Sequence, residues 1–281
     1  MLLVCTLMLL QVYQNASVVV ESSITLFANA VSFSLSVEKN LFIVDQDNNT
    51  LSVVSANNSI VETLGGRGWG TESFDTPTDI TSTFVLDIFV VDYSNRRIMR
   101  FDKNLHFAQI YNHSSIGVDE RFRPIACGIS RQGDMFIVDV DANRVIRTNS
   151  RGQMTGEFGS LGVPNSTLSR PKDIAVSRDD EVMVLDKSNV LIYDRFGNYA
   201  STIELPKDTD WKSISLTDSG IVATSSSQIC ILNRLNGESR IVNKTSIIGA
   251  SIKEPFSDAL LVQNTLNILT ASSLYRCSFS Q

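Results

Sequence analysis

The sequence predicts an all-β fold, a six-bladed β-propeller of four-stranded antiparallel blades. The first marker is an aspartate that ends a short apolar run and recurs every 47 residues, at Asp45, Asp92, Asp139 and Asp186. The second is a proline that lies 15 residues before one of these aspartates, at Pro77, Pro124 and Pro171. Short strands at a period near 45 residues, without helical periodicity, are typical of propeller blades.

The repeat weakens after Asp186 but continues. Gly220–Thr224 and Leu266–Thr270 take the place of the apolar run in two further units, with threonine where the aspartate would stand. The fifth unit is shortened. The sequence therefore predicts six units, centred on residues 45, 92, 139, 186, 224 and 270.

Within a unit, β-branched and aromatic runs between turn signals place four strands. We expect them at residues 79–83, 87–91, 97–101 and 107–111 in the second unit. In the third unit we expect them at residues 125–129, 135–138, 144–147 and 153–158. The second strand of each unit is almost wholly apolar, which fits a blade whose two faces both pack against neighbours.

The last unit holds only three expected strands, at residues 258–262, 266–270 and 273–279. Val18–Phe27 is strand-like and has no place in the first unit. We expect this N-terminal strand to complete the sixth blade, since closing the ring removes exposed sheet edges. Residues 17–281 then form a single propeller domain, and truncation of residues 17–30 should destabilise all of it.

The N-terminal residues 1–10, MLLVCTLMLL, are almost wholly apolar. The run is too short to span a membrane as a helix and is typical of the apolar region of a signal peptide. No Lys or Arg precedes it, so the export signal would be truncated at its start. We expect a leader over residues 1–16 and a secreted or periplasmic protein, with a buried first strand as the alternative.

Charge and cysteine content exclude several classes of protein. The net charge of −6 and the absence of a basic run argue against a nucleic-acid binder. Cys5, Cys127, Cys230 and Cys277 show no paired spacing of a zinc or redox motif. A chain of 281 residues with 43% hydrophobic content buries a core without disulfides. We expect a monomer with no stable membrane span.

The stretch Pro171–Tyr199, PKDIAVSRDDEVMVLDKSNVLIYDRFGNY, resembles an NHL repeat. The glycine-rich loops Gly65–Gly70 and Gly156–Gly162, each followed by an apolar residue and then a proline, share this resemblance. It covers about two thirds of the chain and implies a six-bladed propeller. It says little about function, because such propellers serve many roles.

The recurring aspartate is interpreted as structural, since Asp readily accepts hydrogen bonds from the backbone of a turn. A functional site is expected where the units differ, on the face formed by the loops that lead into the inner strands. There we predict a binding site for a polar ligand, made of Asp79, Asp173, Arg170, Lys172, Arg123 and Trp69. The alternative is a solvated face whose scattered ion pairs contribute little.

Enzyme motifs are sparse. The chain has two histidines, His106 and His113, which cannot form the three-histidine zinc site of one enzyme that resembles this family. No Ser-His-Asp arrangement or phosphate loop is evident. We therefore predict a non-enzymatic binding or scaffold propeller that takes a protein or a small polar ligand and needs no metal or other cofactor. The alternative is a metal-dependent lactonase or lyase of the gluconolactonase-like propeller type.

Overall fold

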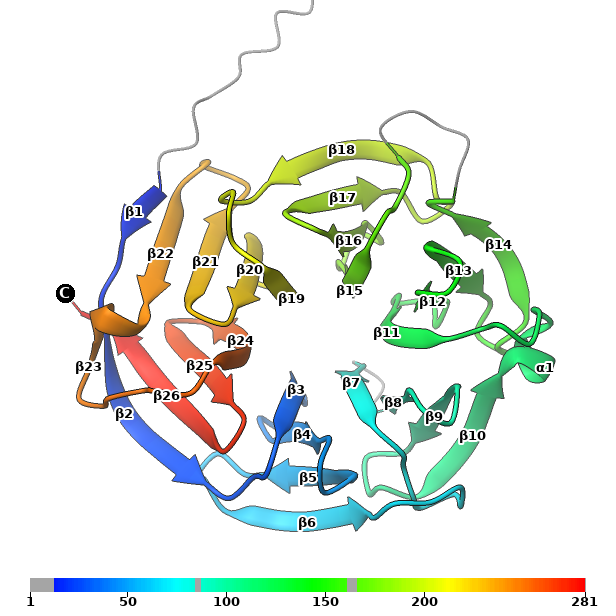
Figure 1. Ribbon diagram of the computed structural model, residues 1–281, viewed down its shortest axis with the longest axis horizontal. Helices are drawn as coiled ribbons and strands as arrows, with labels where there is room; N and C mark the ends of the chain where they lie inside the picture. The colour runs from blue at the N-terminus through cyan, green and yellow to red at the C-terminus, as the bar shows by residue number, and fades with distance from the viewer. Residues whose placement is uncertain (1–12, 84–86, 161–165, 281) are drawn as a thin grey trace, which may run out of the picture.

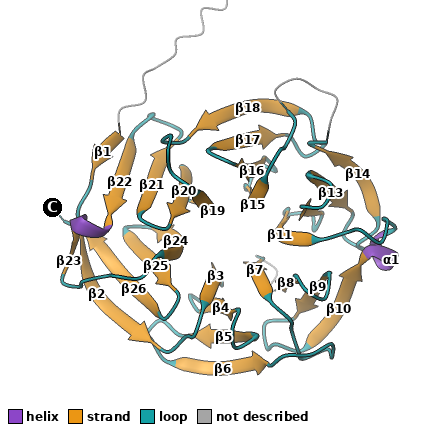
Figure 2. Cartoon of the chain, viewed as in Figure 1, coloured by secondary structure: helices purple, strands orange, loops and turns teal. Residues whose placement is uncertain are grey.

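Six blades surround a central channel in the computed structural model of the protein (Figure 1). The structure describes residues 13–83, 87–160 and 166–280. The predicted all-β propeller is confirmed: the only helical elements within these ranges are the short turns α1 (His113–Ile116) and η1 (Lys244–Ser246) (Figure 2). No helix in the described part of the chain is long and apolar enough to span a membrane.

Blades 1 to 4 each run from an inner strand at the channel to an outer strand at the rim. Blade 1 comprises β3 (Ala30–Leu35), β4 (Leu41–Asp45), β5 (Thr50–Val54) and β6 (Ile60–Gly65). Blade 2 comprises β7 (Pro77–Ser82), β8 (Ile88–Asp92), β9 (Arg97–Phe101) and β10 (Phe107–Asn112). Blade 3 comprises β11 (Pro124–Ile129), β12 (Met135–Asp139), β13 (Arg144–Thr148) and β14 (Met154–Phe158). Blade 4 comprises β15 (Pro171–Val176), β16 (Val182–Asp186), β17 (Asn189–Tyr193) and β18 (Tyr199–Glu204).

Blades 5 and 6 each carry a fifth strand at the rim. Blade 5 comprises β19 (Trp211–Leu216), β20 (Gly220–Ser225), β21 (Gln228–Asn233) and β22 (Ser239–Asn243), with β1 (Tyr13–Asn15) added in parallel. Blade 6 comprises β24 (Phe256–Val262), β25 (Thr265–Thr270), β26 (Ser273–Phe279) and β2 (Val18–Thr25), with β23 (Ile247–Ile248) added in parallel.

The N-terminal strand closes the ring, as predicted. β2 pairs antiparallel with β26 along its length, and Val18 is fully buried in the core between blades 5 and 6. The chain therefore joins its two ends within one blade. Residues 1–12 of the expected leader lie outside the described residues, whereas Tyr13–Asn15 forms β1 on the edge of blade 5.

The core lies between blades. Every residue of β4, β8, β12 and β16 is buried, because neighbouring blades cover both faces of these second strands. The buried side chains form six clusters, each shared by two adjacent blades. Closure of the ring is thus needed to bury all six.

The repeated aspartates hold the loop that leads into their own blade. Asp92 accepts a hydrogen bond from the backbone N–H of Asp75 at 2.7 Å, and Asp186 accepts those of Ser169 and Arg170. Asp45 and Asp139 do the same in their blades. The expected structural role is therefore seen, and Asp45 also accepts the backbone N–H of Asn48 in the turn that follows, at 3.1 Å. Bonds to the loop 16 or 17 residues earlier, which were not expected, occur in all four blades.

Candidate binding site in the central channel

The third residue of each inner strand follows a β-bulge at the same register in all six blades. A bulge re-aims the side chain beside it. In chain order the six residues at this level are Ser32, Asp79, Ala126, Asp173, Ser213 and Asp258. Carboxylates therefore occupy alternate blades, in an approximate threefold arrangement within the channel.

Each of the three carboxylates links its blade to the next one around the ring. Asp79 accepts a hydrogen bond from the backbone N–H of Cys127 at 3.0 Å. Asp173 accepts that of Ile214 at 2.6 Å, and Asp258 accepts that of Phe33 at 3.4 Å. Since Phe33 belongs to blade 1, the last of these bonds crosses the point where the ring closes.

Serines of the preceding blades support two of the three carboxylates. The Ser32 hydroxyl donates to Asp79 at 2.9 Å, and the Ser213 hydroxyl donates to Asp258 at 2.7 Å. The equivalent position before Asp173 is Ala126, which has no hydroxyl group. Asp173 thus accepts fewer hydrogen bonds than its two counterparts.

Burial raises the pKa of all three carboxyl groups, because the charged form loses its hydration. The pKa of Asp258 rises to about 7, mainly through burial and against the lowering effect of its hydrogen bonds. Burial raises the pKa of Asp173 well above its usual range, and the negative charges of Asp79 and Asp258 raise it further. Burial also raises the pKa of Asp79. The channel therefore holds three carboxyl groups with raised pKa values, of which Asp258 binds its proton close to neutral pH.

A cavity of about 1620 Å³ opens from these carboxyls toward one face of the propeller. Its wall runs along the second half of the inner strands to the hairpins that join the first and second strands. Hydroxyl groups recur along it, at Ser34, Ser82, Ser130, Ser177, Ser215 and Thr217. Apolar side chains alternate with them, among them Leu35, Ile129, Leu216 and Leu260.

Charged side chains surround the mouth of this cavity. Two ion pairs link blades 4 and 5 there: Arg234, in the turn after β21, with Glu181 at 2.5 Å, and Arg178 with Asp218 at 3.5 Å. The bidentate bond from Arg234 lowers the pKa of Glu181. Arg131 belongs to the same mouth, on the hairpin of blade 3.

The mouth is asymmetric because two hairpins are short. Five residues (36–40) lie between the paired Leu35 and Leu41 in blade 1. Between the equivalent pairs only four residues lie in blade 5 (217–220) and in blade 6 (262–265). Gly220 permits the short turn of blade 5, since a Cβ there would lie 1.8 Å from the Leu232 carbonyl oxygen. The cavity extends outward over this lower rim to Arg240 and Phe279, whose guanidinium and ring lie 5.5 Å apart.

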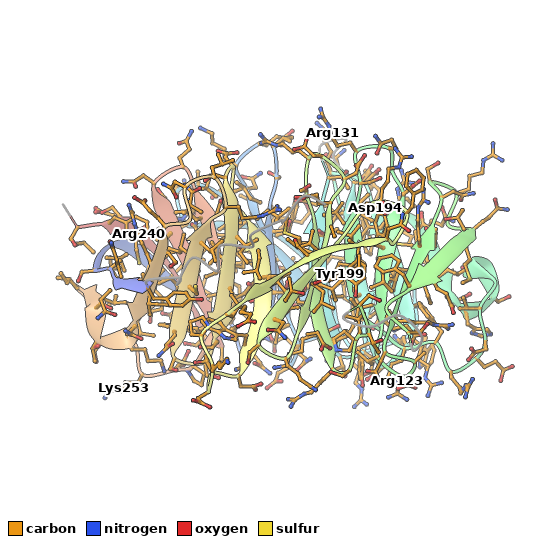
Figure 3. The ribbon with its side chains drawn as sticks, turned by 90° about the horizontal axis from the view of Figure 1, so that it is seen from above. Arg123, Arg131, Asp194, Tyr199, Arg240 and Lys253 are labelled. Carbon is orange, nitrogen blue, oxygen red and sulfur yellow. The ribbon has the colours of Figure 1, made fainter. Side chains whose placement is uncertain are left out.

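The structure divides the six predicted site residues between two levels. Asp79 and Asp173 line the channel cavity. The other four, Arg123, Arg170, Lys172 and Trp69, belong to the loops or inner-strand starts at the opposite mouth and do not line this cavity. Figure 3 shows Arg123 on one face of the propeller and Arg131 on the other.

The four residues at the opposite mouth have their own surroundings. Arg123 bonds to Asp141 at 3.2 Å and lies 5.5 Å from the Tyr93 ring. Lys172 bonds to Asp210 and to the Trp211 carbonyl oxygen. Arg170 approaches the same carboxylate at 3.8 Å. Trp69 is 73% exposed, and its carbonyl oxygen accepts a hydrogen bond from an arginine of blade 2.

The six predicted site residues do not include Asp258, because a count of two residues from Pro255, like that from Pro77 to Asp79, reaches Ser257 instead. The register shows that Phe256, not Pro255, stands where Pro77 stands in blade 2: Phe256 pairs with Thr270 as Pro77 pairs with Asp92. Counting from the end of the second strand did not help, since the hairpin of blade 6 is one residue shorter. A usable signal was the alternation of carboxylates in every second unit.

The described residues contain no group of three or more His, Cys, Asp or Glu side chains arranged to hold a metal ion. His106 bonds to Asp102 in the turn between β9 and β10. His113 begins α1, which follows β10 at the outer edge of blade 2. Neither histidine lines the cavity. Among described side chains, the titratable groups deep in the channel are the three carboxyls and the buried thiol of Cys127, whose pKa burial raises well above its usual value.

Comparisons with known proteins find similarity in fold. No protein-family model matches the chain, and no curated protein matches it. A virginiamycin B lyase of Staphylococcus aureus is 12% identical, with 92% of this chain and 98% of that one covered and a TM-score of 0.65. A catalytically inactive histidine-to-alanine variant of that lyase, with quinupristin, is 14% identical over 89% and 80% of the chains, with a TM-score of 0.63. A gluconolactonase of Xanthomonas campestris is 12% identical over 95% and 97%, with a TM-score of 0.67.

Proposed function

We propose that this propeller binds a polar organic ligand in the channel cavity above Asp79, Asp173 and Asp258. The observation that carries the proposal is the cavity itself, about 1620 Å³ in volume and open at one face. Ligand sites usually measure about 300 to 1,000 Å³, so the cavity has room for a large ligand or for part of a larger one. The ring of hairpins around it supplies both hydrogen-bonding and apolar surface.

The wall favours a ligand rich in hydrogen-bond acceptors that also has apolar parts. Serine and threonine hydroxyls line the cavity wall, and four guanidinium groups lie around its mouth, those of Arg131, Arg178, Arg234 and Arg240. Arg donors suit carbonyl, carboxylate and ether oxygens. The leucine and isoleucine side chains between the hydroxyls offer contact area for the rest of the ligand. The proposed site is therefore on the hairpin face, opposite the loops where the sequence led us to expect it.

The fold comparison supports the choice of this channel without identifying the ligand. A structure of similar fold is that of an inactive lyase with quinupristin, a bulky organic compound. At 14% identity, this likeness extends to the fold alone. It motivates quinupristin as a first probe, together with gluconolactone, the kind of compound suggested by the second class of neighbour.

The test is calorimetric titration of the purified protein with quinupristin, gluconolactone and a panel of oligosaccharides. Ala175→Trp places a bulky ring at a partly buried position that lines the cavity and packs against the core between blades 4 and 5, so its thermal unfolding is measured first. Saturable binding that this variant abolishes, and that a Trp at the exposed, remote Val61 leaves intact, is the expected result. Binding that both variants retain would place the ligand elsewhere.

One observation favours a second candidate, a lyase or lactonase. The Asp258 carboxyl lies in the cavity with a pKa of about 7, which is the range required of a general acid or base at neutral pH. Mass spectrometry of the incubated probes separates the two functions, because only an enzyme changes the mass or opens the ring of its substrate. Conversion that Asp258→Asn abolishes while calorimetric binding persists would establish the enzyme.

We also propose, on the motifs of blades 2 to 4, that the repeats are of NHL type. Export from the cytoplasm, with the leader removed, is likewise a proposal that rests on the apolar residues 1–10. A protein partner on the hairpin face and a monomeric state belong to the same set. Expression of the full gene, followed by fractionation and sequencing of the mature N-terminus, tests export directly.

A further inference from the structure

The second residue of each inner strand lies at the channel mouth opposite the cavity. Thr78 and Lys172 show what this position does: the Thr78 hydroxyl donates to the Ile125 carbonyl oxygen of blade 3 at 2.8 Å, and the Lys172 ammonium donates to the Trp211 carbonyl oxygen of blade 5 at 2.5 Å. Both side chains therefore use their polar group to bridge to the next blade. Lys212 occupies the same position in blade 5.

Lys212 does not make the bond that its counterparts make. Among the described residues its ammonium group has no hydrogen-bond or ion-pair partner, and its side chain is exposed at the mouth. The nearest carboxylate in electrostatic terms, Asp210, already pairs with Lys172 at 2.5 Å and faces Arg170 at 3.8 Å. Lys212 is thus a cation that the protein itself leaves without a counter-charge.

A third ammonium group comes from blade 5's outer edge. Lys244, in η1, donates to the Lys253 carbonyl oxygen at 3.2 Å and lies 5.5 Å from the centre of the Phe256 ring. These two contacts hold it beside the first residue of β24, next to the mouth. Partial burial lowers the pKa of Lys212, Asp210 opposes this effect, and the positive charges of Lys172 and Lys244 lower the pKa further.

The local charge is opposite in sign to that of the whole chain. Four cations gather near this mouth over blades 4 and 5, namely Arg170, Lys172, Lys212 and Lys244, against two carboxylates, Asp210 and Glu254. Glu254 is engaged by the backbone N–H of Ser272 at 3.0 Å. The protein carries a net charge of −6, so a positive cluster of this kind attracts anions to one defined place.

We propose that Lys212, flanked by Lys172 and Lys244, forms a binding site for a small oxyanion of the phosphate class at the mouth opposite the cavity. The ammonium groups supply hydrogen-bond donors to oxygens that carry charge. Ser257 holds the same strand position in the next blade. The site is separate from the cavity, so it stands or falls independently of the function proposed for that cavity.

The test is titration of the full chain with inorganic phosphate in a phosphate-free buffer at constant ionic strength, followed by calorimetry. Lys212→Met should weaken phosphate binding by about tenfold or more, as expected for loss of one charge-assisted hydrogen bond. Lys244→Met should weaken it to a smaller extent. The control is Lys39→Met, in the hairpin of blade 1 on the other face, which should leave the affinity unchanged.

Three results would overturn the proposal: no saturable binding to the wild-type protein, a Lys212→Met affinity within twofold of wild type, or an equal loss in Lys39→Met. Phenyl phosphate and acetate, titrated in parallel, distinguish a phosphate monoester from free phosphate and from a simple carboxylate. Thermal unfolding of each variant without phosphate shows whether the fold is intact. Because Lys212 is exposed and lacks a protein partner, its replacement should not lower the unfolding temperature.

Discussion

The carboxylate of Asp173 accepts a hydrogen bond from the backbone N–H of Ile214 at 2.6 Å, and so joins blade 4 to blade 5 inside the channel. Asp79 and Asp258 make the equivalent bond in alternate blades, with an added hydroxyl donor from Ser32 or Ser213. Three polar bridges between neighbouring blades thus lie inside the central channel. Their first consequence is structural, and their protonation makes it depend on pH.

Supplying the missing hydroxyl should stabilise the protein. In Ala126→Ser the new side chain lies where Ser32 and Ser213 lie in their blades, so it can donate to Asp173. We expect unfolding at pH 7 to cost about 1 kcal/mol more, as for one added buried hydrogen bond, measured by urea denaturation. Ala175→Ser, two residues beyond Asp173 on the cavity wall, is the control and should change little. A less stable Ala126→Ser protein would show that the hydroxyl finds no acceptor there.

Stability should fall between pH 5 and pH 8 through Asp258. Its pKa rises from 3.8 to about 7 in the folded protein, so the folded state binds more protons than the unfolded state between these values. The contribution of Asp258 to the free energy of unfolding is fully present below the unfolded pKa of 3.8, and it is lost as the pH rises through the folded pKa of about 7. At roughly 1.4 kcal/mol per pH unit, Asp258 costs at most about 3 kcal/mol of unfolding free energy between pH 5 and pH 8. Asp173 and Asp79 shift in the same direction and add to it.

The measurement is the free energy of unfolding in urea at pH 5, 6, 7 and 8. Asp258→Asn removes the titrating group and should flatten the curve in this window, whereas Asp218→Asn, at an exposed ion pair, should leave its slope unchanged. A wild-type protein that is more stable at pH 8 than at pH 5 would contradict the assignment of raised pKa values to the channel carboxyls.

The repeat allowed prediction of what each blade shares, and not of what sets one blade apart. The spacing of Asp45, Asp92, Asp139 and Asp186 predicts the ends of four second strands, and each of these residues does end one. Asp79 and Asp173 were singled out because they break the repeat, and they lie in the channel. Their depth and their bonds to neighbouring blades depend on a β-bulge that no residue pattern marks.

The side of the propeller that holds the cavity could not be predicted for a physical reason. The loops that lead into the inner strands differ most from one repeat to the next. Their backbone carbonyl groups are nevertheless bound by buried side chains such as Arg97, which occupies the space beneath the loop before β7. The hairpins on the other face look uniform, but their length sets the height of the rim. The hairpins of blades 5 and 6 are one residue shorter, and the cavity reaches beyond them to Arg240 and Phe279. Such a difference in length carries no chemical signature in the sequence.

Replacing Arg97 should destabilise the glycine-rich loop before β7. Its guanidinium bonds to Asp92 at 2.7 Å and to the carbonyl oxygens of Trp69, Gly70 and Ser73. The Asp92 side chain is fully buried, so Arg97→Met leaves a buried carboxylate without its cation. We expect Arg97→Met to lower the free energy of unfolding by about 3 to 5 kcal/mol, measured by urea denaturation. Arg67→Met, at an ion pair whose arginine is 77% exposed, is the control and should cost less than about 1 kcal/mol.

Removal of β2 should unfold the ring rather than fray one blade. β2 supplies the fourth strand of blade 6, and Val18 is fully buried between blades 5 and 6. A chain that begins at Leu26 loses β1 and β2, which exposes the edge of β26 and opens the core cluster around Val18. A chain that begins at Ala16 lacks residues 1–15, and so loses β1 but keeps β2; it is the matched control. We expect the first to lose cooperative thermal unfolding and the second to keep it with a modestly lower midpoint.

Val18→Asp in the full chain tests the same contact without truncation, since it buries a charge in that cluster. If both Val18→Asp and the chain that begins at Leu26 unfolded at the wild-type temperature, closure of the ring by β2 would be unnecessary for stability.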